Sequence, residues 1–373
     1  MYIKNLKLQN FRNYENAEIE FNKNINILYG DNAQGKTNIL EAIFFSSFGK
    51  SFRTLKEKEI IKKDKEFSKI EVEYVKKDRE GNIKFLISKD NKKSIFINDI
   101  KIKKLSELLG NVNIVLFEPS DINIFKEGPK YRRKFLDMMI GQLRSNYVYN
   151  LNQYLKVLEQ RNNYLKQNNY NEEVLDIWDE SLVKYGKVIF NYRNEFIDKI
   201  KEKIVDIHKK IANEEITMKY ISDCEDENLF LKKLKENREE DRKRGYTTVG
   251  IQRDDFKLFV NHEMVSVYGS QGQNRTCVLS LKLAELQVIY DDIGEYPILL
   301  LDDFMSELDQ KRINNFLKNI EDIQVIITCT KNIDLKNSKS FYIEKGKIKL
   351  DKDWFFNIYY ICNFINKKLN FTY

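Results

Sequence analysis

Eight residues near the start of the chain have the spacing of a phosphate-binding loop. The run Gly30-Asp31-Asn32-Ala33-Gln34-Gly35-Lys36-Thr37 places two glycines, a lysine and a threonine in the order that such a loop requires. The glycines let backbone N–H groups close around phosphates, Lys36 can reach the β- and γ-phosphates, and the Thr37 hydroxyl can bind Mg²⁺. We therefore predict a nucleoside triphosphate and Mg²⁺ as ligands.

Two adjacent acids far downstream can supply the carboxylate that a phosphate-binding loop needs to hold its metal ion. Asp302 and Asp303 directly follow the apolar residues 298–301. Such a run predicts a buried parallel strand, and ligands of open α/β sheets bind beyond the carboxyl ends of the strands. Because phosphoryl transfer depends on positioning and charge neutralisation, we assign Asp302 to Mg²⁺ and Asp303 to the attacking water. An ordinary helix cap or turn is the alternative for such a pair.

The elements around the loop are those that would hold it in place. Residues 25–29 alternate like a short strand, and residues 39–48 repeat apolar side chains at helical spacing until Gly49. A second helix start follows Ser270-Gln271-Gly272-Gln273, because apolar residues recur at helical spacing over 278–286. Since helix N-termini attract phosphate and one nucleotide already has its own loop, this start suggests a site shared by two chains. The alternative is a capped helix without a ligand.

Further stretches resemble one known family. They are residues 8–14, 38–43, 51–54, 117–121, 132–137, 160–162 and 269–286. With the loop, they resemble the ABC-type head ATPases of the SMC and Rad50 class and, within that class, the RecF family of DNA replication and repair proteins. The resemblance extends over residues 1–349. It implies ATP-driven homodimerisation, duplex or gapped DNA as a partner, and RecO, RecR and RecA as protein partners.

The resemblance also implies roles for individual residues. Asp303 and Lys36 would act in hydrolysis, and Thr37 and Asp302 would hold Mg²⁺. Ser270, Gln271, Gly272 and Gln273 form the signature motif, which would contact the ATP of the second chain, and residues 306–309 form the D-loop. The residues expected to bind ATP in the same chain are Gly30, Asp31, Asn32, Ala33, Gln34, Gly35, Lys36, Thr37, Asn38, Arg12 and Asn13.

The chain departs from the wider pattern at several positions. Asp303 stands where most ABC ATPases have Glu, and an acid one methylene shorter predicts slow hydrolysis. Thr328 or Thr330 occupies the position of the usual switch histidine, and no obvious Gln-loop glutamine follows the strand expected at 113–117. Ile251 and Gln252 replace the Pro and His that the family usually shows.

Composition limits the classes of function. Four well-separated cysteines and two histidines indicate neither a disulfide framework nor a zinc site. No signal peptide or 18-residue apolar span is evident, so we expect a cytoplasmic protein that does not enter a membrane. A net charge of +7 permits nucleic-acid binding. Candidate DNA contacts lie in two basic clusters, although lysine-rich surfaces are commonly only solvated: Lys62, Lys63, Arg132, Arg133 and Lys134.

The periodicity of the chain, together with the family resemblance, predicts an α/β fold in four parts. Residues 1–110 read as the β-rich first part of an ATPase head, and residues 246–350 as its second part with the signature and the acids. Residues 111–245 read as a helical lobe with a short antiparallel two-helix arm, whose turn lies within 162–171. SMC and Rad50 proteins insert far longer coiled coils. We also expect a hairpin from 256–260 and 264–267, and we assign no function to the aromatic tail 351–373.

Three classes of function share these motifs. The first is an ATP-gated DNA clamp, in which Mg·ATP closes a homodimer around DNA and slow hydrolysis reopens it. The second is the ATPase subunit of a membrane transporter, which normally has a compact helical lobe and a switch histidine. The third, an ATPase joined to a nuclease, would need an acidic catalytic module that the chain does not show after Lys349.

Overall fold

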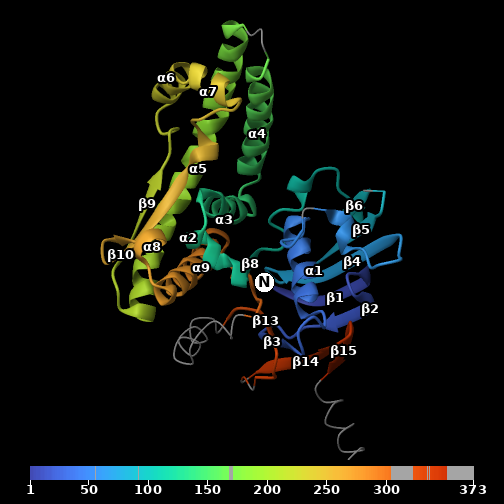
Figure 1. Cartoon of the computed structure of the whole chain (residues 1–373). Coiled ribbons are helices and arrows are strands. Elements are labelled where there is room, and N and C mark those ends of the chain that lie inside the picture. The colour runs from blue at the N-terminus through green and yellow to red at the C-terminus, as the bar shows by residue number, and fades with distance from the viewer. Residues whose placement is uncertain are drawn as a thin grey trace, which may run out of the picture. The chain divides into compact units, whose positions relative to one another are not determined.

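The computed structural model describes residues 1–54, 56–90, 92–167, 171–303, 322–333, 335 and 337–350. These residues form two compact units, one built from Met1–Pro119 and the described residues from Glu295 onward, and the other from Ser120–Gly294. Figure 1 shows both units. The expected D-loop and the aromatic tail lie outside the described residues. Within the described ranges, no helix combines the length and the apolar character needed to cross a membrane.

An antiparallel sheet makes up much of the first unit. Its strand order is β2-β1-β4-β5-β6-β7, and each strand pairs with its neighbour in antiparallel fashion. The strands are β1 (Tyr2–Phe11), β2 (Tyr14–Glu20), β4 (Phe67–Lys76), β5 (Arg79–Ser88), β6 (Lys93–Ile97) and β7 (Ile100–Lys101). Alternate residues of β4 and β5 are buried, which is the pattern of a sheet with one face on the core. The β-rich first third of the chain is thus confirmed.

A second, mostly parallel sheet carries the predicted phosphate loop and acids. Its order is β15-β14-β3-β13-β12-β8, with only β15 antiparallel to its neighbour. The strands are β3 (Ile25–Tyr29), β8 (Ile114–Phe117), β12 (Ile298–Leu301), β13 (Val325–Cys329), β14 (Ser338–Glu344) and β15 (Lys347–Leu350). All four residues of β12 are buried, as its continuous apolar run predicts. Because β3, β13 and β12 are parallel neighbours, their carboxyl ends meet at one edge.

Helix α1 (Lys36–Phe48) follows the loop and packs against strands of both sheets, including β4, β8 and β13. Nearly all of its residues are buried, which suits a helix enclosed between two sheets. It ends at Gly49, whose φ of 62° is left-handed, as the sequence predicted. The unit also contains the short helices η1 (Glu57–Ile60) and η2 (Leu105–Glu107).

The second unit is mainly helical, with one small sheet. That sheet has the order β11-β10-β9 and is formed by β9 (Ile216–Ile221), β10 (Asp255–Val260) and β11 (Glu263–Met264). The helices are α2 (Asn123–Lys126), α3 (Pro129–Gly141), α4 (Ser145–Leu165), α5 (Glu172–Ala212), α6 (Glu227–Glu236), α7 (Arg238–Arg244), α8 (Val265–Tyr268) and α9 (Gln271–Ile293). Two short helices, η3 (Pro119–Ile122) and η4 (Ile251–Arg253), complete it.

Helices α4 and α5 lie side by side and form the predicted arm (Figure 1). Helix α5 has 41 residues, so it extends over about 60 Å at 1.5 Å per residue. Its start is capped by Asn171, whose side chain accepts the Glu173 N–H at 2.8 Å. Apolar residues of α5 that recur at helical spacing are buried against α4 and α9.

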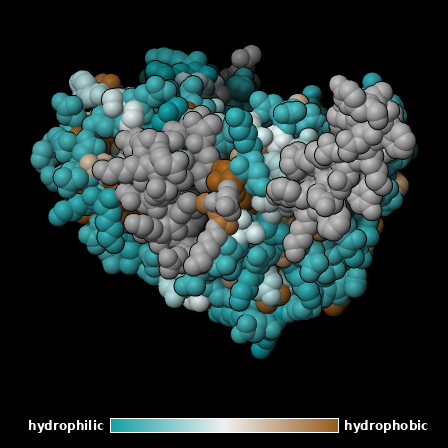
Figure 2. Space-filling view, turned by 90° about the horizontal axis from the view of Figure 1, so that it is seen from below, coloured by the Kyte–Doolittle hydropathy of each residue, from teal (hydrophilic) through white to brown (hydrophobic). Residues whose placement is uncertain are grey.

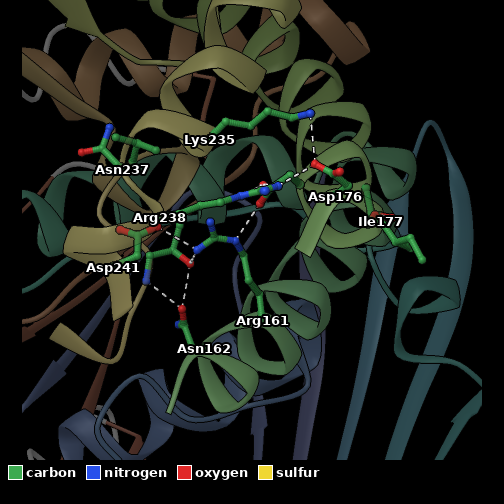
Figure 3. A network of polar contacts seen from close by, with 12 residues as sticks. Arg161, Asn162, Asp176, Ile177, Lys235, Asn237, Arg238 and Asp241 are labelled. Carbon is green, nitrogen blue, oxygen red and sulfur yellow. Dashed lines mark hydrogen bonds and ion pairs between the residues drawn. The ribbon is translucent and has the colours of Figure 1, made fainter. Parts of the chain in front are cut away.

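A buried polar network fastens the arm to the helices that follow it (Figure 3). The completely buried Arg161 of α4 pairs with Asp179 of α5 at 2.7 Å and with Asp241 of α7 at 2.8 Å. Arg238 of α7 donates to the same Asp179 carboxylate at 2.6 Å. Because buried charges are tolerated only with partners, these arginines are structural. The stretch 160–162, which is part of the family resemblance, therefore stabilises the arm through Arg161.

Two sequence expectations differ from the structure. In the predicted hairpin, Phe259 pairs with Met264, but β11 ends there and the buried Val265 begins helix α8. The compact units also divide the chain at 119/120 and 294/295, whereas the expected parts divide at 110/111 and 245/246. The physical reasons are that β8 pairs with β12 and that α9 packs along α5. The three described cysteines are buried and free.

Candidate nucleotide-binding site

The loop between β3 and α1 has a backbone that depends on its glycines. Gly35 has a φ of 118°, and a Cβ atom there would lie 2.6 Å from the Asn13 amide nitrogen. Gly30 has a φ of 144°, and a Cβ atom there would meet the Ile343 carbonyl oxygen. Both positions therefore require glycine. The tight backbone leaves the N–H groups of the loop and the start of α1 free of side-chain bulk, which is the arrangement that binds phosphate.

Lys36 is folded against its own loop. Its Nζ donates to the carbonyl oxygens of Gly30 at 2.6 Å and Asp31 at 2.7 Å. Burial lowers the pKa of the Lys36 ammonium, while the carboxylates of Asp303 and Asp302 act in the opposite direction. The side chain therefore stands in the loop beside both acids, as the sequence analysis required.

Thr37 of α1 and Thr328 of β13 meet at the carboxylate of Asp302, which directly follows β12. Asp302 Oδ1 accepts a hydrogen bond from Thr37 Oγ1 at 2.9 Å and another from Thr328 Oγ1 at 2.8 Å. Thr328 Oγ1 in turn accepts the Asp303 N–H at 2.8 Å. Oxygen ligands are those that Mg²⁺ prefers, and the Thr37 hydroxyl and the Asp302 carboxylate are adjacent. These two residues therefore fit the ion that we assigned to them.

The rest of the loop is held by β1, β2 and β14–β15. Asn13 donates to the Gln34 carbonyl oxygen at 2.8 Å and accepts from the Asn38 amide at 2.8 Å. The Gln34 side chain accepts the Lys345 N–H at 2.7 Å. The expected ATP-binding residues Asp31, Asn32 and Ala33 are exposed at the tip of the loop. Asn13 thus contacts the loop itself.

Arg12 lies beside the loop but is engaged by an acid that the sequence analysis missed. Its Nε and Nη2 donate to both oxygens of Glu41 at 2.8 and 2.5 Å, and Glu41 is fully buried in α1. Arg53 lies 3.7 Å from the same carboxylate and donates to Asn38 at 2.7 Å. The sequence signal that could have identified Glu41 is its position as a lone acid within the apolar run 39–43, because an isolated buried carboxylate needs a cationic partner.

The signature residues form the start of α9 in the second unit. Ser270 caps the helix: its Oγ accepts the Gln273 N–H at 3.2 Å, and the Gln273 side chain accepts the Ser270 N–H at 3.0 Å. This reciprocal pair is a capping box. Ser270 and Gln271 are exposed, and Gly272 is partly exposed. The predicted helix start after Ser270 is confirmed, and its contact with the nucleotide of a second chain stays a prediction.

The candidate DNA contacts differ sharply in accessibility. Lys63 and Lys134 are exposed, and Lys62 donates to the Asn13 carbonyl oxygen at 3.0 Å. Arg132, by contrast, is buried and binds Asp255 through two hydrogen bonds of 2.5 and 3.1 Å.

Arg133 also forms a hydrogen bond within the second unit. It donates to the Asp254 carbonyl oxygen at 2.8 Å, and burial lowers the pKa of its guanidinium. Because the Arg132 charge is already paired inside the protein and the Arg133 guanidinium bonds to a backbone carbonyl oxygen, we no longer propose these two residues as DNA contacts. Basic residues in sequence do not reveal their pairing.

Comparison with known proteins identifies what this chain is similar to. The family model described as the RecF/RecN/SMC N terminal domain matches residues 2–346. The DNA replication and repair protein RecF of Clostridium botulinum strain ATCC 19397 is 47% identical over 363 residues, covering 94% of this chain and 100% of that protein. A solved structure of the recombination mediator protein RecF with ATP has 38% identity and a TM-score of 0.89, covering 94% of this chain and 97% of that chain.

A more distant likeness concerns the fold alone. The SMC head bound to the C-winged helix domain of ScpA has 18% identity and a TM-score of 0.55, covering 94% of this chain and 97% of that chain. The predicted α/β ABC-type ATPase head is therefore confirmed as the fold.

Proposed function

The chain belongs to the RecF family of DNA replication and repair proteins, and from this premise we propose that it is an ATP-gated DNA-binding protein that dimerises on ATP. The observation that carries the proposal is the Asp302 carboxylate, which bonds to Thr37 of the loop and to Thr328 of β13. This geometry places an acid beside the first turn of α1, where a nucleotide's phosphates bind.

Each residue of the site has a role in this proposal. The loop N–H groups and the start of α1 bind the triphosphate, and Lys36 turns from its own carbonyl partners to the β- and γ-phosphates. Thr37 and Asp302 hold Mg²⁺, which when bound neutralises charge on the phosphates. Asp303 accepts a hydrogen bond from the attacking water. Because its side chain is one methylene shorter than Glu, it orients the water less well, and turnover is slow.

The signature supplies the opposite wall of the pocket in a second copy of the chain. Ser270 and Gln271 are exposed and Gly272 is partly exposed in the unit that contains them, so this turn is accessible to another protomer. Helix N-termini stabilise negative charge, which suits contact with the γ-phosphate. ATP thereby joins two heads, and its hydrolysis releases them.

DNA binding is the output of this cycle. Lys62, Lys63 and Lys134 are the remaining contact candidates, and the net charge of +7 favours a polyanion. We assign loading of a recombinase at gapped DNA, with RecO, RecR and RecA as partners, on the strength of the family. One related structure is described as belonging to the RecFOR pathway. The relatives are DNA replication and repair proteins, which favours this role over that of a transporter ATPase subunit.

The test is the mass of the full-length protein with and without Mg·ATP, measured by sedimentation velocity. Asp303→Asn slows hydrolysis while preserving the loop, so we expect a dimer that persists with ATP. Lys36→Met removes the ammonium that contacts the phosphates, and we expect a monomer in both conditions, with hydrolysis reduced about 100-fold or more.

The proposal fails if Asp303→Asn shows the same monomer with and without ATP. A dimer of Lys36→Met that forms equally well in both conditions would also contradict it, because association would then not depend on the nucleotide.

A further inference from the structure

The signature glutamine bonds at both ends of its side-chain amide. Gln273 Oε1 accepts the Ser270 N–H at 3.0 Å, and Gln273 Nε2 donates to Glu214 Oε1 at 2.9 Å. The first bond closes the turn that begins α9. The second reaches a residue 59 positions earlier in the chain, outside the signature.

Glu214 lies just beyond the end of the arm helix. Helix α5 ends at Ala212, and Asn213 caps it in a left-handed conformation with a φ of 55°. The Glu214 side chain is 26% exposed, and its Oε2 lies 3.9 Å from His208 Nε2 on α5. Its Oε1 also lies 3.5 Å from the Asn261 amide nitrogen, between β10 and β11. The carboxylate thus collects contacts from α5, from the β10–β11 turn and from α9.

His208 makes a second contact between the end of α5 and α9, further along α9 than the signature. This histidine is completely buried, and its Nδ1 lies 2.9 Å from Ser280 Oγ of α9. Its other ring nitrogen has no hydrogen-bond partner among the described residues and lies 3.9 Å from Glu214 Oε2. The two helices lie side by side in Figure 1, and these contacts fix one against the other.

The chemistry of the two side chains gives Glu214 a specific effect. A glutamine amide has an oxygen that accepts and a nitrogen that donates, and rotation by 180° exchanges them. An ionised carboxylate only accepts, so Glu214 selects the orientation in which the Gln273 nitrogen faces it. In that orientation the Gln273 oxygen faces the Ser270 N–H and completes the capping box. Without the carboxylate, the opposite orientation would present an NH₂ group to the Ser270 N–H.

We propose that Glu214 is a positioning residue for the signature turn, which it holds in the geometry that receives the nucleotide of the second copy. The inference rests on the proposed function. It makes the end of the arm a determinant of ATP-dependent pairing: a displacement of α5 that separates Glu214 from Gln273 loosens the turn at Ser270.

The test measures the ATP concentration that gives half-maximal dimerisation of the full chain in the Asp303→Asn background. Glu214→Ala should raise that concentration about tenfold, the effect of losing one hydrogen bond to a charged group. Glu214→Gln can still accept from Gln273 and should retain most of the affinity. Glu215→Gln is the matched control: its side chain is 60% exposed, faces His262 and should change nothing.

A charge swap separates positioning from a general loss of structure. Gln273→Glu alone places two carboxylates together and should weaken dimerisation at least as much as Glu214→Ala. Combining Gln273→Glu with Glu214→Gln restores one donor and one acceptor, and a glutamate suits the third helical position of a capping box. The double variant should therefore recover dimerisation.

Two further readouts decide the outcome. Binding of a fluorescent ATP analogue to dilute monomer should be equal in the parent, Glu214→Ala and Glu214→Gln, because the phosphate loop belongs to the other unit. If the parent does not dimerise on ATP, the proposed function is overturned and this inference with it. If the parent dimerises but Glu214→Ala keeps the same midpoint, or the double variant stays as weak as Gln273→Glu, the inference alone is overturned.

Discussion

Thr328 organises both acids of the site through one hydroxyl group. It donates to Asp302 Oδ1 and accepts the Asp303 N–H, each at 2.8 Å. Thr328 is 1% exposed, and both bonds are partly buried. The sequence left Thr328 and Thr330 as equal candidates for the switch position. Thr330 follows β13 and is exposed, so the structure favours Thr328 as the residue that sets the acids.

Replacing this hydroxyl tests its importance at the scale of one residue. Thr328→Val preserves the shape but leaves the Asp303 N–H unpaired, at a cost of about 1–3 kcal/mol. We expect ATP hydrolysis to fall about 10- to 100-fold, with a higher Mg²⁺ requirement and little change in ATP binding. Steady-state hydrolysis across a Mg²⁺ series measures this. Thr330→Val is the control, and an equal loss in that variant would argue against a special role for Thr328.

Helix α9 carries a buried ionisable cluster in addition to the signature. Glu285 is buried, and its Oε2 lies 3.4 Å from Lys282 Nζ. Lys282 Nζ also lies 3.7 Å from Asp121, at the start of the second unit. Burial raises the pKa of Glu285 to about 7, although attraction to Lys282 opposes the rise. The helix therefore contains a carboxyl group that titrates near neutral pH.

This titration predicts how stability changes with pH. The pKa of Glu285 rises from 4.5 to about 7 on folding, so the folded state binds more protons between these values. The contribution of this group to stability is fully present below the unfolded pKa and is lost as pH rises through 7. Glu285→Gln should remove that loss, so the variant gains roughly 1–3 kcal/mol relative to the parent between pH 5.5 and 8.

Urea unfolding of the full chain at several pH values measures this difference. Glu202→Gln, at a position 73% exposed on α5, is the control and should follow the parent at every pH. A parent and a Glu285→Gln variant with parallel pH profiles would show that Glu285 does not titrate in this range.

At the scale of the whole molecule, the two compact units divide the proposed chemistry. The phosphate loop and the acids belong to the first, and the signature and the arm belong to the second. ATP binding to the phosphate loop of the first unit can therefore be measured separately from the contribution of the signature in the second unit. Among the described residues visible in Figure 2, most are hydrophilic, and the hydrophobic ones form small separate groups.

Salt dependence tests DNA binding at this scale. Each lysine that contacts a phosphate releases counterions, so the logarithm of the binding constant falls with the logarithm of salt concentration. We expect Lys63→Ala and Lys134→Ala each to weaken ATP-dependent duplex binding and to reduce the slope by about 1. Fluorescence anisotropy across a salt series measures both effects.

Lys156→Ala is the matched control for these variants, because Lys156 is an exposed lysine of α4 outside the candidate clusters. Equal losses in all three variants would indicate a general effect of charge. Unchanged slopes for Lys63→Ala and Lys134→Ala would exclude both residues as phosphate contacts.

Local sequence patterns determined the elements of this protein and the ligand of its loop. The glycines of residues 30–35, the apolar run of β12, the cap at Ser270 and the period of the arm helices act over a few residues. Backbone sterics and burial decide such features, so spacing in the sequence is sufficient to predict them. The family resemblance added the signature and the expected dimer.

Only the tertiary structure decided which charges and hydroxyls meet. The pairing of Arg12 with Glu41, of Arg132 with Asp255 and of Gln273 with Glu214 joins residues far apart in the chain. We predicted Arg132 as a DNA contact because the sequence of a basic cluster is the same whether its side chains are solvated or paired with acids. Contacts of this kind depend on how distant elements pack. The free energy of a charged side chain depends on its burial and on its partner, and the spacing of residues along the chain specifies neither.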